Sequence, residues 1–277
     1  DLPLSRGLGD VYKRQSTKYG AIVSISDKIE TLISIFISGK RPSGSSDPYA
    51  LRRNLNGVIL IIWQFELDLD IQNIFKELID YWKISLPNLK FEKVKVLNDL
   101  IEFSNQRIIS HLDELSISKD LIKATCFINS SAEKKIMNIL DLKNKINTLK
   151  QLKEKANFPE IQKVISRVSK LAESGNLNRT IFSHKDYINQ DLFEKECETK
   201  VFQFIKQIEE IISLPNWDCF QLFNLFENNT NNLNELFDND KGVLIMSEDP
   251  VIKNNRLNLL GLIRNYSLII ADFTKLN

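Results

Sequence analysis

The sequence predicts an all-α protein built as a helical bundle. Three observations support this fold class. Apolar residues recur at helical spacing through most of the chain, no segment alternates convincingly with a period of two, and the clearest local motifs are helix starts. Only the short apolar stretch 243–246 is ambiguous between strand and helix. Of the 277 residues 43% are apolar, which is enough for one large or two smaller cores.

The first half of the chain contains predicted helices with a shared apolar periodicity. The clearest start is at Asp47, whose carboxylate can accept from the first-turn N–H groups, followed by Pro48 at the first helical position. From Leu51 onward apolar residues mark one face, and Leu60 and Ile61 off that face predict later turns that are buried nearly all round. The helices predicted here span 22–37, 47–66, 70–83 and 89–115.

The second half continues in the same way. Ser118 and Ser131 are candidate helix caps, and Asp249-Pro250 repeats the start seen at Asp47. Residues 228–240 are polar and rich in Asn, which predicts a linker or a frayed turn. The helices predicted here span 118–127, 131–156, 159–172, 191–214, 217–226 and 249–275, with a loop at 175–189.

The charge is nearly balanced overall but unevenly distributed. The net charge is +1, so no global basic field indicates nucleic acid. Residues 133–170 contain ten Lys or Arg against four acids, whereas residues 191–240 contain eleven acids against three lysines. Such segments are either solvated helix faces that balance each other or a phosphate-tracking face with an acidic side elsewhere.

The residue types also limit the cellular location and the kinds of chemistry that the protein can be expected to have. No stretch approaches the roughly 18 apolar residues of a membrane span. Cys126, Cys197 and Cys219 lack paired spacing and are typical of free thiols in a reducing, cytoplasmic protein. His111 and His184 have no ligand spacing and are expected to be surface or helix-end residues. With no Gly-rich phosphate loop either, the sequence predicts no catalytic residues and no metal site.

Two blocks of motifs resemble one family. Asp27-Lys28-Ile29-Glu30-Thr31-Leu32, Gly39-Lys40-Arg41-Pro42-Ser43-Gly44 and Asp47-Pro48-Tyr49-Ala50-Leu51-Arg52-Arg53 resemble, in order and spacing, the bacterial-type glycyl-tRNA synthetase β subunit. Near the other end, Val243-Leu244-Ile245-Met246, Asp249-Pro250, Asn255-Arg256-Leu257 and Ala271-Asp272-Phe273 resemble a second family block. The resemblance covers residues 16–277 and implies the C-terminal portion of such a subunit.

The resemblance implies a domain division and a division of labour. Residues 16–85 would be the end of a degenerate HD-like helical domain, and residues 86–277 a helical anticodon-binding, DALR-like domain. Residues 1–15 resemble a translated adaptor and are set aside as non-native. The family implies an α2β2 glycine–tRNA ligase that uses ATP and Mg²⁺, with the chemistry on the α subunit and none of these cofactors bound by this part.

RNA recognition is therefore the expected role, and glycine tRNA and the α subunit are the expected partners. Arg256 interrupts the apolar stripe of the last helix, so it is either a structural ion-pair residue, with Asp249 as a candidate partner, or an arginine that reaches a phosphate or base. The candidate RNA contacts are the following cations: Lys40, Arg41, Arg52, Arg53, Arg107, Arg167, Lys170, Arg256 and Arg264.

Two other function classes remain open at this point. The first is a fragment of an HD-type metal-dependent phosphohydrolase, which would need a His-Asp set that residues 16–277 lack. Asp27, on the helix that resembles the end of such a domain, is therefore interpreted as structural. The second is a helical protein-interaction scaffold without an RNA function, which tRNA-binding measurements would distinguish.

Overall fold

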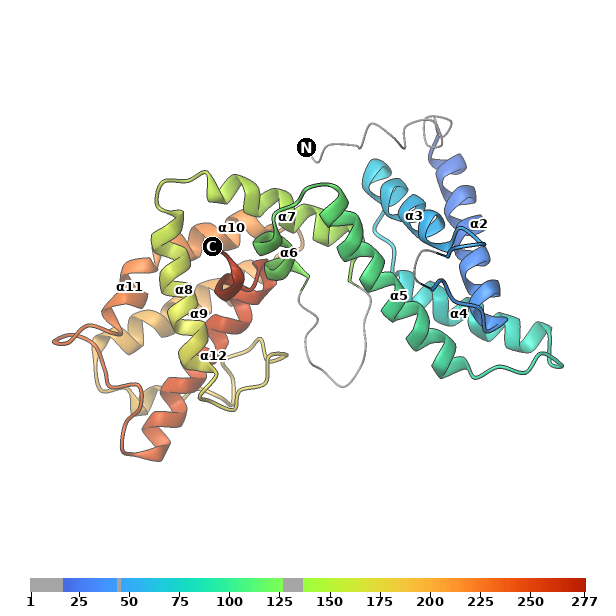
Figure 1. Cartoon of the computed structure of the whole chain (residues 1–277). Helices are drawn as coiled ribbons and strands as arrows, with labels where there is room; N and C mark the ends of the chain where they lie inside the picture. Colours follow the sequence, from blue (N-terminus) through green and yellow to red (C-terminus); the bar gives the residue numbers. More distant parts are fainter. Residues whose placement is uncertain (1–16, 44–45, 127–136) are drawn as a thin grey trace. The chain divides into compact units, whose positions relative to one another are not determined.

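The computed structural model describes residues 17–43, 46–126 and 137–277. Within these residues every regular element is an α-helix or a short 3-10 helix, and an isolated bridge between Ser43 and Ser46 is the only β pairing (Figure 1). The all-α prediction is confirmed. None of the described helices combines the length and the apolar character needed to cross a membrane. The described residues form two compact units, with unit 1 comprising 17–43, 46–122 and 137–147 and unit 2 comprising 123–126 and 148–277.

Unit 1 is built around α3 (Leu51–Phe65), which packs along α2 (Lys18–Ile37). Every residue from 55 to 63 of α3 is buried, as the sequence predicted. Helix α5 (Lys93–Glu114) packs against α2, α3 and α4 (Ile71–Ser85). The division between the two units falls within the short helix α6 (Lys119–Thr125) and again within α7 (Ile139–Lys153).

The start of α3 differs from the prediction. Asp47 does bind the first turn, since its carboxylate oxygens accept from the N–H groups of Leu51 at 2.8 Å and Arg52 at 3.0 Å. The helix nevertheless begins at Leu51, not at Pro48. Ala50 takes the cap position in the left-handed region with φ 56°, after a turn closed by its N–H on the Asp47 carbonyl. The Asp-Pro pair thus forms a turn whose carboxylate reaches forward to the helix.

Unit 2 is organised around α12 (Pro250–Ile270), which is buried along most of its length. Helix α8 (Phe158–Ala172) packs along it, and α9 (Glu196–Ile212) and α10 (Cys219–Asn228) also contact it (Figure 1). A Cβ atom at Gly261 would lie only 2.9 Å from the Leu177 side chain. Glycine at this position therefore lets the loop after α8 lie directly on α12. The remaining elements are η1 (Gln190–Leu192), α11 (Thr230–Glu235) and η2 (Phe273–Lys275).

One prediction about the organisation needs correction, and the domain division stays a prediction. The polar segment 228–240 contains the helix α11, which is held by the buried Leu233. The expected boundary at residue 85 does not separate the compact units, because α5 packs on the helices before it and the division falls near residue 147. The HD-like and anticodon-binding labels for the two parts stay predictions. Segment 1–15 lies outside the described residues.

Candidate nucleic-acid interface

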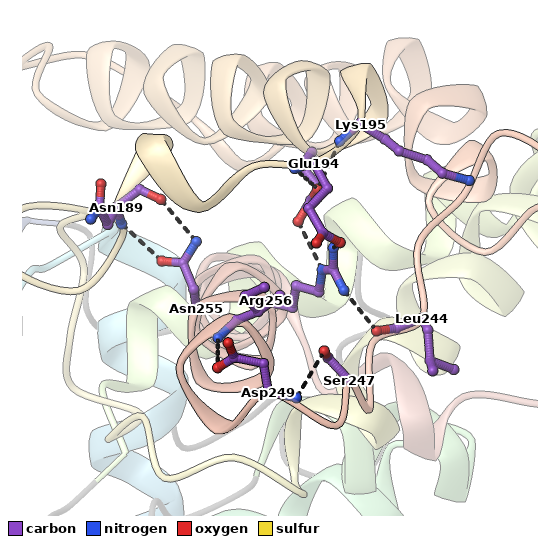
Figure 2. A network of polar contacts seen from close by, with 10 residues as sticks. Asn189, Glu194, Lys195, Leu244, Ser247, Asp249, Asn255 and Arg256 are labelled. Atoms are coloured by element: carbon purple, nitrogen blue, oxygen red, sulfur yellow. Dashed lines mark hydrogen bonds and ion pairs between the residues drawn. The ribbon is translucent and has the colours of Figure 1, made fainter.

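Arg256 is enclosed in a network of ion pairs and hydrogen bonds (Figure 2). Only 3% of its side chain is exposed. Its Nε donates to Glu198 Oε1 at 2.9 Å, its Nη2 to Glu194 Oε2 at 2.5 Å, and its Nη1 to the Leu244 carbonyl at 3.0 Å. Burial lowers the pKa of Arg256, but the hydrogen bonds and charges of the two carboxylates outweigh it and hold the pKa above its usual value.

Glu198 joins this network to the start of α9. It is fully buried, and its other carboxylate oxygen accepts from the N–H groups of Glu194 at 2.8 Å and Lys195 at 3.1 Å. Asp249 is not the partner of Arg256. Its carboxylate instead caps α12, accepting from Val251 N–H at 2.7 Å (Figure 2). Arg256 thus forms a structural ion pair, which is one of the two alternatives that the sequence left open, and its guanidinium is engaged within the protein.

Arg264, two turns further along α12, is also buried, with 4% of its side chain exposed. Its Nη2 donates to the Leu177 carbonyl at 2.7 Å, and its Nε and Nη2 donate to Asn265 Oδ1. Asn265 in turn donates to the carbonyls of Asn178 and Ile181. These contacts hold the loop 175–189 on α12. Arg264 is a structural residue, not a surface contact.

Two arginines of unit 1 are likewise engaged within the protein. Arg41 pairs with Asp99 at 2.7 Å, donates to the Phe36 carbonyl and lies 4.0 Å from the centre of the Phe36 ring. It thereby fixes the loop before α3 to α2 and α5. Arg107 bonds Asn56 Oδ1 at 2.6 Å and pairs with Glu114. To contact RNA, as predicted, each of these arginines would have to give up the contacts that its guanidinium group makes within the protein.

The other predicted cations lie nearer the surface. Lys40 is exposed and lies 4.8 Å from the centre of the Tyr49 ring. Arg53 is exposed, whereas Arg52 is partly buried. In unit 2, Arg167 and Lys170 are both exposed on α8, and Arg167 lies 4.2 Å from the centre of the Phe237 ring.

Helix α8 adds a cation that the sequence analysis missed. Lys163 is exposed and lies four residues before Arg167, which lies three before Lys170. This spacing places all three on one face of the helix. No ion pair involves any of them within the part of the chain that the structure describes. The three residues define the α8 basic face. Its i, i+4, i+7 spacing was visible in the sequence.

Several charges of the two charged segments are engaged in ion pairs. Lys155 of the basic segment pairs with Glu227 at 2.7 Å, and Lys145 pairs with Asp141 at 2.7 Å. In the acidic segment Glu235 pairs with Lys200 at 3.0 Å. The pair between Lys155 and Glu227 joins the two segments, and the three cations of the α8 basic face make no ion pair within the described residues.

Neither histidine forms a reactive or metal-binding cluster. His184 Nδ1 lies 2.7 Å from Glu209, which also accepts from the buried Tyr266 hydroxyl at 2.8 Å. His111 lies in the last turn of α5, as expected for a helix-end residue, but it is buried, with 2% exposed. Neither ring nitrogen has a hydrogen-bond partner, and Nδ1 lies 3.6 Å from Glu114 Oε2. Burial lowers the pKa of His111 below its usual 6.5. Within the described residues, no group of three or more His, Cys, Asp and Glu could hold a metal ion.

A separate opening in unit 1 has a different character. It is a groove of about 1080 Å³ between α2 and α4, lined mainly by apolar side chains such as the exposed Ile22 and Tyr81. Asp27 and Glu30 lie at its edge. Acids at an apolar groove do not suit a phosphate backbone, so this groove is distinct from the α8 basic face.

Comparison with known proteins identifies the family. The family model described as glycyl-tRNA synthetase beta subunit matches residues 6–126. This match includes part of segment 1–15, whose non-native origin stays a prediction. Glycine–tRNA ligase beta subunits from Trichodesmium erythraeum and Gloeothece citriformis are 32% and 30% identical over 98% of the chain, which spans 38% of each. The Aquifex aeolicus subunit is 30% identical over 95% of the chain. The chain belongs to the glycyl-tRNA synthetase beta subunit family.

Proposed function

We propose that the chain is the RNA-contacting part of a glycine–tRNA ligase β subunit. The observation that carries this proposal is similarity over nearly the whole chain to proteins named as such subunits. Because the chain spans about a third of their length, the ligase activity, its substrates and its partners are part of the proposal. The expected anticodon-arm contact and the α subunit in an α2β2 assembly belong to it as well, as does a cytoplasmic location.

In this proposal the chemistry of glycine activation lies outside the described residues. ATP and Mg²⁺ serve the complete ligase, with the adenylate formed on the α subunit. The chain alone should then form no glycyl-adenylate. Glycine-dependent exchange of pyrophosphate into ATP by the purified chain, measured without any α subunit, would contradict this assignment.

The α8 basic face is the best-supported RNA contact in unit 2. Lys163, Arg167 and Lys170 are exposed and carry positive charges that no carboxylate neutralises within the described residues. Lys and Arg side chains of this kind bind backbone phosphates and position an RNA without reading its sequence. In unit 1, Lys40, Arg52 and Arg53 stay candidates. Arg41, Arg107 and Arg256 leave the set because the protein itself engages their guanidinium groups, whereas Arg264 is buried and keeps one nitrogen, Nη1, with only long contacts.

Titration of glycine tRNA with the chain at several salt concentrations tests the proposal. The variant Lys163→Ala/Lys170→Ala should bind more weakly, and the salt dependence should flatten by about one unit of slope per lysine removed. It should weaken an anticodon-swapped tRNA equally, because phosphate contacts carry no sequence information. Lys185→Ala, which removes an exposed lysine from the loop after α8, is the matched control. An unchanged slope in the double variant would refute the α8 contact.

The same titration addresses the alternatives. A helical scaffold without an RNA function would show no tRNA binding beyond that of a charge-matched unrelated protein. No observation favours the HD-type phosphohydrolase. Asp27 lines the apolar groove, and both histidines lie far from it in the sequence. Measurable tRNA binding that depends on the α8 basic face would exclude the scaffold.

A further inference from the structure

A polar recess opens in unit 2 beside the end of the α8 basic face. It has a volume of about 380 Å³ and lies where α8, the loop after it, the end of α12 and η2 meet. Its cationic lining residues come from two regions of the chain that are far apart in sequence, Lys170 and Arg179 from one and Arg264 and Lys275 from the other. Lys170 and Arg264 belong to the set of RNA contacts that the sequence predicted, whereas Arg179 and Lys275 do not.

The charges around the recess favour an anion. Its two carboxylates, Glu173 and Asp272, are already engaged. Glu173 pairs with Arg179 at 2.8 Å and lies 3.6 Å from Arg264, and Asp272 accepts from the Thr274 hydroxyl at 2.6 Å. The lining therefore carries more cations than carboxylates. Neither Lys170 nor Lys275 has an ion-pair partner among the described residues.

Two groups in the recess also have unused hydrogen-bonding capacity. Ser169 is 6% exposed, and its hydroxyl makes no hydrogen bond in the part of the chain that is described. Arg264 Nη1 has only long contacts, 3.5 Å to the Ala172 carbonyl and 3.6 Å to Glu173. A hydroxyl and a guanidinium N–H with this capacity at the wall of the recess can donate to a ligand with acceptor oxygens.

We propose that this recess binds a phosphate group of the RNA backbone, with Ser169 and Arg264 at its base and Lys170, Arg179 and Lys275 at its rim. The inference rests on the proposed function for the identity of the RNA, but the phosphate chemistry follows from the recess alone. A phosphate oxygen accepts hydrogen bonds from guanidinium, ammonium and hydroxyl donors, and all three are present. Lys170 belongs both to the recess and to the α8 basic face, so one strand could run from the face into the recess.

The first test uses inorganic phosphate as the probe. Phosphate should raise the melting temperature of the full chain, and Lys275→Gln should abolish the increase. Lys275 is exposed and makes no ion pair within the described chain, so its replacement should leave the fold intact. Lys241→Gln removes another exposed lysine of unit 2 and should keep the full effect. An equal phosphate response in both variants and the wild type would overturn the proposed site.

The second test measures tRNA affinity and separates the sources of phosphate. Lys275→Gln should weaken tRNA binding about tenfold, as expected for one lost hydrogen bond between charged groups, and Ser169→Ala should weaken it less. If tRNA still binds through the α8 basic face while both variants bind like the wild type, the recess is not a phosphate site and the proposed function stands. If tRNA does not bind at all, the RNA source is refuted, even where phosphate stabilisation still requires Lys275.

Discussion

Replacement of Arg256 by methionine should destabilise unit 2 strongly. Methionine matches the length of the arginine stem but removes the positive charge and every donor. Glu198 would then be a fully buried carboxylate without a cation, and the Leu244 carbonyl would lose its guanidinium donor. Removing one partner of a buried ion pair leaves an uncompensated buried charge, which is strongly destabilising.

The magnitude follows from the burial of each partner. Breaking a buried pair by removing one member costs about 3–5 kcal/mol. Glu198 keeps hydrogen bonds from the N–H groups of Glu194 and Lys195, so we expect the lower end, about 3 kcal/mol. The pair with Glu194, which is 58% exposed, adds at most about 1 kcal/mol. For a unit of this size, about 3 kcal/mol corresponds to a fall of about 10 °C in melting temperature.

Urea unfolding of the full chain, followed by far-ultraviolet circular dichroism, measures the effect. Trp217 is the tryptophan of unit 2, whereas Trp63 and Trp82 belong to unit 1, so fluorescence helps to assign the transition. Lys253→Met is the matched control, because Lys253 lies on the same helix and its replacement should change stability by less than about 0.5 kcal/mol.

A double variant gives the sharper test of the ion pair. In Arg256→Met/Glu198→Gln no buried charge is left unpaired, so the double variant should be more stable than the sum of the two single losses predicts. Arg256→Lys should also lower stability, because an ammonium cannot keep the fork of contacts, and it should leave the preference among tRNAs unchanged. A loss below about 0.5 kcal/mol for Arg256→Met would refute the structural role.

Three further predictions concern other buried or capping groups. Because burial lowers the pKa of His111, this histidine binds a proton more readily in the unfolded chain than in the folded chain. Its contribution to stability is therefore fully present above pH 6.5 and is lost as the pH drops below that value. His111→Leu should flatten this pH dependence, as measured by urea unfolding at a series of pH values. Asp249→Ala removes the α12 cap and should cost about 1 kcal/mol in the same assay, whereas the neighbouring Glu248→Ala should cost little. Burial raises the pKa of the Cys126 thiol to about 11, so iodoacetamide at mildly alkaline pH should modify the half-buried Cys219 before Cys126, as mass spectrometry of peptides would show; equal rates would contradict the burial.

The local features of the chain could be predicted from sequence because their causes are local. Helical spacing located most of the helices, and Asp70 and Asp249 act as caps through N–H groups only two or three residues away. The start of α3 was misjudged by a turn although Asp47 does bind its N–H groups. A carboxylate can reach the first turn from outside the helix as well as from its cap position, and spacing alone does not distinguish the two.

The roles of the cations depended on tertiary structure. The sequence showed that Arg256 interrupts an apolar stripe, which identified a residue in need of a partner, but its partner Glu198 lies 58 positions away. Likewise the Arg264 guanidinium meets a carbonyl 87 positions away. Which carboxylate or carbonyl faces a buried guanidinium is decided by how distant helices and loops pack. Sequence alone therefore determined the fold class and most of the helices, whereas packing decided which cations stabilise the protein and which remain free to bind phosphate.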